Sequence, residues 1–205
     1  MSETKANITV LVSGGGTNLQ AIIDAEKSGI IISGSVKLVI SNNPDAFALE
    51  RAKKAGIDTA VITKKQEGSK EAFEKKLIDT IEKYDTDIIV LAGFMSILSE
   101  NFTSHFERKI LNVHPSLIPS FCGEGFYGLH VHKAALKKGV KVTGATVHFV
   151  NEIPDGGEII MQKAVAVPEG STPESLQKRV MRLAEWKILP LATELVSQKI
   201  MKEGK

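Results

Sequence analysis

Short apolar runs alternate with helical patterns along most of the chain. The runs are continuous and rich in β-branched residues, which is typical of strands covered on both faces of a parallel sheet. They lie at residues 8–12, 36–40, 59–62, 87–92 and 110–113. Between them, apolar residues recur at helical spacing, and Ser69 is placed to cap one such helix. The alternation predicts an α/β fold with a doubly wound, mostly parallel sheet, in which ligands bind beyond the carboxyl ends of the strands.

The last third of the chain has a different pattern. Residues 144–150 and 158–167 both read as strands, and only the loop 151–157 separates them, so we expect an antiparallel hairpin. Thr172-Pro173 is a strong helix start, with a capping hydroxyl followed by proline at the first helical position. This predicts a terminal helix, which we expect Pro190 to kink or interrupt.

Composition restricts the class of protein. With 205 residues, 42% of them hydrophobic and 24% charged, the chain fits one continuous globular domain spanning 1–205. Its single cysteine, Cys122, cannot form an internal disulfide, and no secretory pattern opens the sequence, so we expect a cytoplasmic protein. No apolar run is long enough to cross a bilayer. The net charge of +2 comes without a basic block, which argues against nucleic-acid binding.

A glycine turn follows the first predicted strand. Ser13-Gly-Gly-Gly-Thr-Asn18 lies where a strand leads into a helix, and small residues there let backbone N–H groups and the helix dipole face an anion. The turn lacks the Gly-Lys-Ser/Thr of a Walker loop, and Leu19 occupies the place of the third glycine of the dinucleotide pattern. The sequence favours a site for one phosphate group, with a tight turn that binds no ligand as the alternative.

Two polar residues end the predicted strand at 110–113. Asn112 and His114 are separated by one residue, so they should point to the same side of the sheet. An amide that can stabilise an oxyanion beside an imidazole that can move a proton forms a plausible acyl-transfer pair. A strand end with a structural histidine is the alternative at this stage.

Asp155 lies in the loop of the predicted hairpin. Asp155-Gly156 is also a common turn signal, and by itself the turn interpretation is favoured. A carboxylate near His114 would, however, orient the imidazole and stabilise its charge. His148 is expected to be structural, Cys122 to be a free thiol, and the lack of a Cys/His cluster at ligand spacing predicts no metal site.

Five separated blocks resemble the phosphoribosylglycinamide formyltransferase family over nearly the whole chain. They are Val12-Ser-Gly-Gly-Gly-Thr-Asn-Leu19, Leu91-Ala-Gly-Phe-Met95, Leu111-Asn-Val-His-Pro-Ser-Leu117, Val147-His-Phe-Val150 and Asp155-Gly-Gly157. The Asn-x-His-Pro-Ser-Leu block is shared by folate-dependent formyl transferases and hydrolases of this fold. The Ser-Gly-x-Gly-Ser/Thr-Asn-Leu block is much more particular to the glycinamide enzyme.

The resemblance implies a Rossmann-like formyltransferase fold and a reaction in purine synthesis. A formyl group would pass from 10-formyltetrahydrofolate, as co-substrate, to the amine of 5-phosphoribosylglycinamide, without a metal or a covalent enzyme intermediate. The amine would attack the formyl carbon directly. Asn112 and protonated His114 would stabilise the oxyanion, while Asp155 would fix the imidazole and help to relay the amine's proton. The expected partners are these small molecules, with a monomer or homodimer as the assembly.

The resemblance also implies which residues bind the substrates. Gly16, Thr17 and Asn18 would hold the ribosyl phosphate, and Glu185 would contact the glycinamide substrate. The implied folate-binding residues are Lys70, Met95, Ser96, Ile97, Leu98 and Asn112. Phosphate binding would thus fall mainly in residues 1–100, with the folate and catalytic half in 101–205.

Some positions depart from the family's pattern. Ser96 replaces a common arginine, Lys70 stands where some members have arginine, and Trp186 occupies a frequent histidine position. The stretch Phe121–Tyr127 is longer than in the shortest members. These departures concern contacts with the folate tail and loops, and they leave the expected reacting centre intact.

Three other functions are alternatives to this interpretation. A methionyl-tRNA formyltransferase would be expected to carry a basic C-terminal domain, and a formyl-folate hydrolase an additional N-terminal regulatory domain. The first strand begins by Ile8, and the sequence stops at Lys205 soon after its last helix. The third alternative is a phosphate-binding regulator that has lost catalysis, which the presence of all three expected catalytic residues disfavours.

Overall fold

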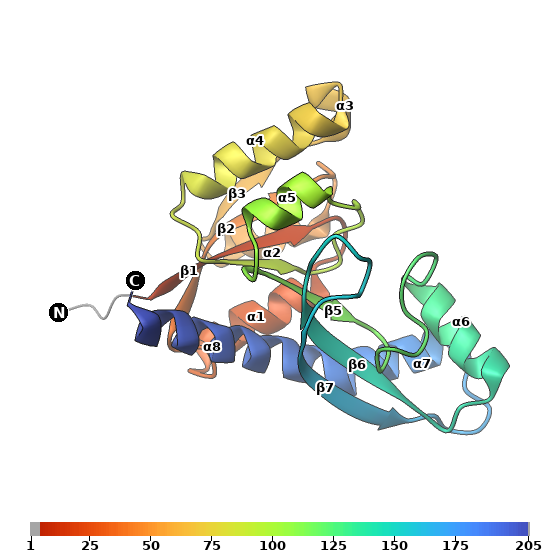
Figure 1. Cartoon of the computed structure of the whole chain (residues 1–205). Coiled ribbons are helices and arrows are strands. Elements are labelled where there is room, and N and C mark those ends of the chain that lie inside the picture. Colours follow the sequence, from red (N-terminus) through yellow and green to blue (C-terminus); the bar gives the residue numbers. More distant parts are fainter. Residues whose placement is uncertain (1–4, 205) are drawn as a thin grey trace.

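The structure is a computed structural model that describes residues 5–204. Its strands form one seven-stranded sheet in the order β3-β2-β1-β4-β5-β6-β7 (Figure 1). The strands are β1 (Ala6–Val12), β2 (Gly34–Ser41), β3 (Asp58–Val61), β4 (Ile88–Leu91), β5 (Ile110–His114), β6 (Val142–Phe149) and β7 (Ile159–Ala166). The first five run parallel, whereas β6 is antiparallel to both β5 and β7. The predicted α/β fold with a C-terminal hairpin is confirmed.

Helices cover both faces of the sheet, as the continuous apolar strands require. They are α1 (Thr17–Lys27), α2 (Phe47–Lys54), α3 (Lys64–Glu67), α4 (Lys70–Glu82), α5 (Glu100–His105), α6 (Leu129–Lys138), α7 (Pro173–Val180) and α8 (Trp186–Glu203). In Figure 1, α4 and α5 lie on one face of the sheet, and α1 and α8 lie on the other. Each face has its own buried cluster: Phe73, Leu77 and Phe102 belong to the first, and Leu19, Ile22 and Leu189 to the second.

The predicted helix starts have the expected capping contacts. The Ser69 hydroxyl accepts from the backbone N–H of Ala72 at 3.1 Å. Thr172 and Ser175 form a reciprocal capping box directly before and within α7. These contacts satisfy N–H groups that would otherwise have no partner in the first helical turn.

The terminal helix is interrupted, but not at Pro190. A π-helical segment, η1 (Met181–Glu185), separates α7 from α8, and Pro190 lies inside α8. The prediction was wrong in position: the helix continues through Pro190, which lacks only its own backbone N–H donor, and the departure from α-helical geometry lies in the five residues before α8. The π segment itself matters for the site, since such segments often shift a side chain towards a functional position.

Candidate active site

The site begins where the chain changes direction within the sheet. From β1 the chain proceeds to β2 and β3 on one side, and then returns to β4 on the other. The turns after β1 and β4 therefore lie at the switch point, the usual place for a ligand in a doubly wound fold. A hydrogen bond of 2.8 Å joins them, from the backbone N–H of Met95 to the hydroxyl of Ser13.

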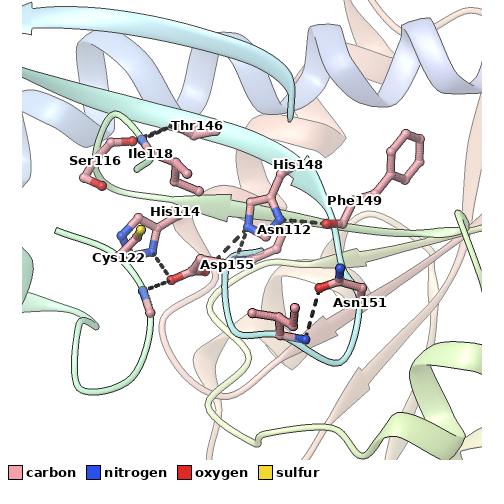
Figure 2. A network of polar contacts seen from close by, with 12 residues as sticks. Asn112, His114, Ser116, Ile118, Cys122, Thr146, His148, Phe149, Asn151 and Asp155 are labelled. Atoms are coloured by element: carbon pink, nitrogen blue, oxygen red, sulfur yellow. Dashed lines mark hydrogen bonds and ion pairs between the residues drawn. The ribbon is translucent and has the colours of Figure 1, made fainter. Parts of the chain in front are cut away.

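The structure brings the three expected catalytic residues together. Asn112 and His114 lie near the carboxyl end of β5, and the β6–β7 loop carries Asp155 to them (Figure 2). Nδ1 of His114 is 3.3 Å from a carboxyl oxygen of Asp155. His114 is buried, with 4% of its surface exposed. The loop thus places a carboxylate beside the imidazole, the contact that the turn signal alone left open.

Backbone groups of one loop hold both members of this pair. Nε2–H of His114 donates to the carbonyl of Phe121 at 2.8 Å. The N–H of Gly123 donates to the carboxylate of Asp155 at 2.9 Å. Phe121, Gly123 and Asp155 all have positive φ angles, of 52°, 87° and 55°. Such backbone is uncommon outside glycine, and at Phe121 and Asp155 the surrounding contacts must stabilise it.

Burial and nearby polar groups act in opposite directions on the pKa values of both His114 and Asp155. Burial lowers the pKa of His114, although Asp155 and the Phe121 carbonyl favour its protonated form. Burial alone would raise the pKa of Asp155. Hydrogen bonds from His148 and Gly123, together with the nearby imidazoles, outweigh that effect and lower it. Asp155 is therefore an anion near neutral pH, positioned to orient or charge-stabilise His114.

His148 has a more specific place than the structural role expected of it. It is paired with Asn112 across the β5–β6 ladder, and its Nε2 lies 3.3 Å from the Asn112 amide nitrogen. The same Nε2 is 3.5 Å from Asp155, while Nδ1–H donates to the carbonyl of Phe149 at 2.7 Å. His148 therefore contacts two of the three expected catalytic side chains. Its strand alternation was visible in the sequence, but the antiparallel register that sets it opposite Asn112 was not.

A third buried histidine lies within range of the charge of His114. His132, within α6, is fully buried, and neither ring nitrogen has a hydrogen-bond partner among residues 5–204. Burial and the charge of His114 lower its pKa to about 4. Its imidazole is consequently neutral near pH 7. Cys122 is nearby in the loop, where burial and Asp155 raise the pKa of its thiol, which fits the expected unreactive free cysteine.

The expected phosphate residues form the entry to α1. Gly16 precedes the helix with φ +70°, and a Cβ at this position would come within 2.6 Å of the Cβ of Ala48. Only glycine fits this conformation and this close approach. Thr17 is the first residue of α1, and Asn18 donates to the carboxyl of Glu185 at 2.9 Å. Burial raises the pKa of Glu185 to about 7, opposed by the hydrogen bond from Asn18.

The expected folate residues are split between an exposed strip and a helix start. Met95 and Ile97 are 62% and 75% exposed, and Ser96 accepts from the Asn42 amide at 2.8 Å. Lys70, at the start of α4, lies 3.9 Å from Glu74, whose carboxylate accepts from Ser99 beyond the strip. Exposed apolar side chains next to a polar centre are suited to an aromatic ligand. Among residues 5–204, no hydrogen bond or ion pair joins Lys70 to Asn112.

Known proteins are similar to this chain over most of its length. The sequence pattern of the family described as "Formyl transferase" matches residues 6–193. The Escherichia coli (strain K12) protein "Phosphoribosylglycinamide formyltransferase" is 46% identical over 185 residues, which cover 90% of this chain and 84% of the relative. The chain belongs to the phosphoribosylglycinamide formyltransferase family. The resemblance stated from the sequence blocks is thereby confirmed.

A further relative and a solved structure also match nearly the whole chain. The bovine "Trifunctional purine biosynthetic protein adenosine-3" is 46% identical over 200 residues; the chain spans only 19% of that relative's length. The crystal structure of glycinamide ribonucleotide transformylase 1 from Symbiobacterium toebii superposes with a TM-score of 0.89 at 42% identity, covering 95% of this chain and 89% of the other. The formyltransferase fold is therefore shared across nearly the whole chain.

Within residues 5–204 of this formyltransferase family member, no group of three or more His, Cys, Asp or Glu side chains is arranged to hold a metal ion. Over the same residues, no helix combines the length and apolarity needed to span a bilayer.

Proposed function

We propose that this chain transfers a formyl group from 10-formyltetrahydrofolate to the amine of 5-phosphoribosylglycinamide, a step of de novo purine (IMP) biosynthesis. The observation that carries the proposal is the meeting of Asn112, His114 and Asp155 at the end of β5 in a chain of this family. The amide supplies a hydrogen-bond donor, the imidazole can carry a proton, and the carboxylate stabilises the imidazolium.

The chemical step needs no covalent intermediate on the protein. The neutral amine of the acceptor forms a bond to the formyl carbon, and the carbonyl electron pair moves onto oxygen. Asn112 and protonated His114 donate to this oxyanion. Asp155 helps the amine proton to leave, directly or through water, and N10 of the folate takes up a proton as its bond to the formyl carbon breaks.

The hydrogen-bond geometry of His114 sets a condition on its catalytic role. Both ring nitrogens face protein acceptors, the Asp155 carboxylate and the Phe121 carbonyl. Donation to the oxyanion therefore requires the imidazole to exchange the Phe121 carbonyl for the substrate oxygen. Because burial lowers the pKa of His114 in the free protein, its protonation belongs to the loaded site, where developing negative charge favours the imidazolium.

The substrates occupy the two sides of the switch point in this proposal. Gly16, Thr17 and Asn18 bind the phosphate, supported by the glycine turn and the start of α1. Glu185 contacts the glycinamide substrate, supported by its bond to Asn18. The folate contacts Asn112, Lys70 and the strip Met95, Ser96, Ile97 and Leu98, supported by the exposure of Met95 and Ile97. One cleft would hold both reactants, which supplies the orientation that transfer needs.

The proposal also covers domain organisation, cellular location and assembly. Residues 1–205 act as one formyltransferase domain, with phosphate binding mainly in 1–100 and catalysis in 101–205. The protein works in the cytoplasm as a monomer or homodimer, on small molecules rather than nucleic acids or membranes. Sedimentation at micromolar concentration would separate the two assemblies.

The function is tested with purified protein and 10-formyltetrahydrofolate, with and without phosphoribosylglycinamide. Folate product that forms only with the acceptor is the expected result. Product without the acceptor would instead indicate a hydrolase, and no product in either case would contradict transfer to this acceptor.

Two variants test the residue roles in the same assay. Asn112→Ala and His114→Ala should fold yet lose transfer by about a hundredfold or more. His105→Ala is the matched control, since His105 pairs with Glu82 on the surface at 2.9 Å. Full activity in either active-site variant would overturn the assigned role.

A further inference from the structure

Three successive carbonyl groups of the glycine turn are held by one neighbouring segment. The Asn43 side chain donates to the carbonyl of Ser13 at 3.3 Å. The backbone N–H of Ala48 donates to Gly14 at 3.0 Å, and Nε–H of Arg51 donates to Gly15 at 2.8 Å. All three donors come from the loop after β2 and from α2. This segment therefore fixes the peptide orientation along the whole turn.

Peptide planarity carries this orientation to the N–H groups. In a trans peptide the carbonyl of one residue and the N–H of the next point in opposite directions. The carbonyls of Ser13, Gly14 and Gly15 face α2 and the loop before it. The N–H groups of Gly14, Gly15 and Gly16 therefore point away from that segment. Within residues 5–204, none of these three N–H groups has a hydrogen-bond acceptor. They form a row of free donors beside the start of α1, the arrangement that suits an anion.

The packing around the glycines also differs between the two sides of the turn. A Cβ at Gly16 would meet Ala48 at 2.6 Å, so the α2 side of the turn is closed. At Gly14 and Gly15 a Cβ would meet nothing within 4 Å. The turn is thus packed against α2 on one side and open on the other.

Arg51 adds an uncompensated charge to this arrangement. Its Nη1–H donates to the Gln20 side chain at 3.0 Å, and its guanidinium lies 5.0 Å from the ring centre of Phe47. These partners and the Gly15 carbonyl are all neutral. No carboxylate of residues 5–204 forms a salt bridge with Arg51. A full positive charge therefore lies directly behind the turn, where it favours an anion on the open side.

We propose that Arg51 is a positioning residue for the acceptor's phosphate group: it holds the Gly15 carbonyl away from the site and supplies a fixed positive charge behind the turn. The inference rests on the proposed function and deepens it. Arg51 acts through the turn, bridging α2 to Gln20 on α1, and so determines preference for a phosphorylated acceptor. Because Arg51 is remote from the Asn112–His114–Asp155 cluster in the chain and contacts none of it, folate use should not depend on it.

The test compares phosphoribosylglycinamide with its dephosphorylated counterpart, ribosylglycinamide. In Arg51→Met, kcat/KM for the phosphorylated acceptor should fall by about tenfold or more, through KM, since the Gly15 carbonyl loses its donor and the positive charge behind the turn is removed. The value for ribosylglycinamide and the KM for the folate should stay within about twofold. Lys54→Met, which removes an exposed charge from the same helix, is the control and should change neither.

Arg51→Lys separates charge from geometry and covers the case in which Arg51→Met fails to fold. Lysine keeps the charge but cannot reproduce the two-point contact to Gly15 and Gln20, so we expect an intermediate loss of phosphate preference. An unchanged preference in both variants would overturn the proposal. An equal loss for both acceptors would also overturn it, because it would indicate general structural damage.

A binding measurement keeps this inference separate from the proposed function. Ribose 5-phosphate should raise the melting temperature of the wild-type protein and of Lys54→Met, and raise that of Arg51→Met much less. If the wild-type protein shows no acceptor-dependent turnover, the proposed function fails whatever Arg51 does. If the wild type is active and ribose 5-phosphate protects wild type and Arg51→Met equally, only the role of Arg51 fails.

Discussion

Asn18 donates a hydrogen bond of 2.9 Å to Glu185 across 167 positions of sequence. The bond joins the first turn of α1 to the π segment η1 and is the only one that Glu185's carboxyl makes within residues 5–204. A buried carboxyl with one partner favours its neutral form, and the pKa of Glu185 is accordingly raised to about 7.

Glu185→Gln should stabilise the protein at alkaline pH. The wild-type carboxyl must ionise in a buried place, so stability that is fully present below its ordinary pKa of 4.5 is lost as the pH rises towards about 7. The loss amounts to roughly 3 kcal/mol. Glutamine mimics the protonated acid and can still accept from Asn18. Melting curves should be similar at pH 5 and diverge at pH 8 in favour of the variant; a pH-independent difference would contradict the buried-acid explanation.

Asp155→Asn should reduce transfer by about a hundredfold or more while the protein stays folded. The substitution removes the charge that stabilises the His114 imidazolium but keeps an oxygen that can accept from Gly123. Activity and the melting temperature are measured together. Normal turnover with a lowered melting temperature would return Asp155 to a turn-forming role alone.

His148→Phe should lower kcat, with a smaller effect on the KM values for the acceptor and for the folate. The ring fills similar space, but it has no nitrogen to make a polar contact with the Asn112 amide or with Asp155, so the catalytic side chains lose a common partner. We expect about a tenfold loss in kcat. His105→Phe provides a surface control, and equal kcat values for both variants would show that the contacts of His148 do not matter for the reaction.

Gly16→Ala should destabilise the fold, whereas Gly14→Ala should be well tolerated. At Gly16 a methyl group meets Ala48 and the backbone has φ +70°, while at Gly14 the space is open. We expect a loss of about 1–3 kcal/mol in unfolding free energy for Gly16→Ala. Denaturant unfolding of both variants checks this, and similar midpoints would contradict the close approach to α2.

Several elements could be predicted because their signals are local. The β-branched runs of β1 and β4, the Ser69 cap and the Thr172-Pro173 helix start depend on residues next to one another in sequence. The Asn112 and His114 pairing on one face of β5 follows from the two-residue repeat of a strand. Pro190 misled the prediction because a single proline does not indicate where a helix will absorb an extra residue.

The sequence by itself determined the succession of the main strands and helices along the chain and the glycine turn at the start of α1. Through its family resemblance, it also indicated the residues expected to react. Only the tertiary structure decided that His148 lies opposite Asn112, that Asp155 reaches His114, and that Arg51 holds the Gly15 carbonyl. The reason is physical. Secondary structure follows from spacing along the chain, whereas contacts such as that between Asn18 and Glu185 depend on strand register and helix packing, which join residues far apart in sequence.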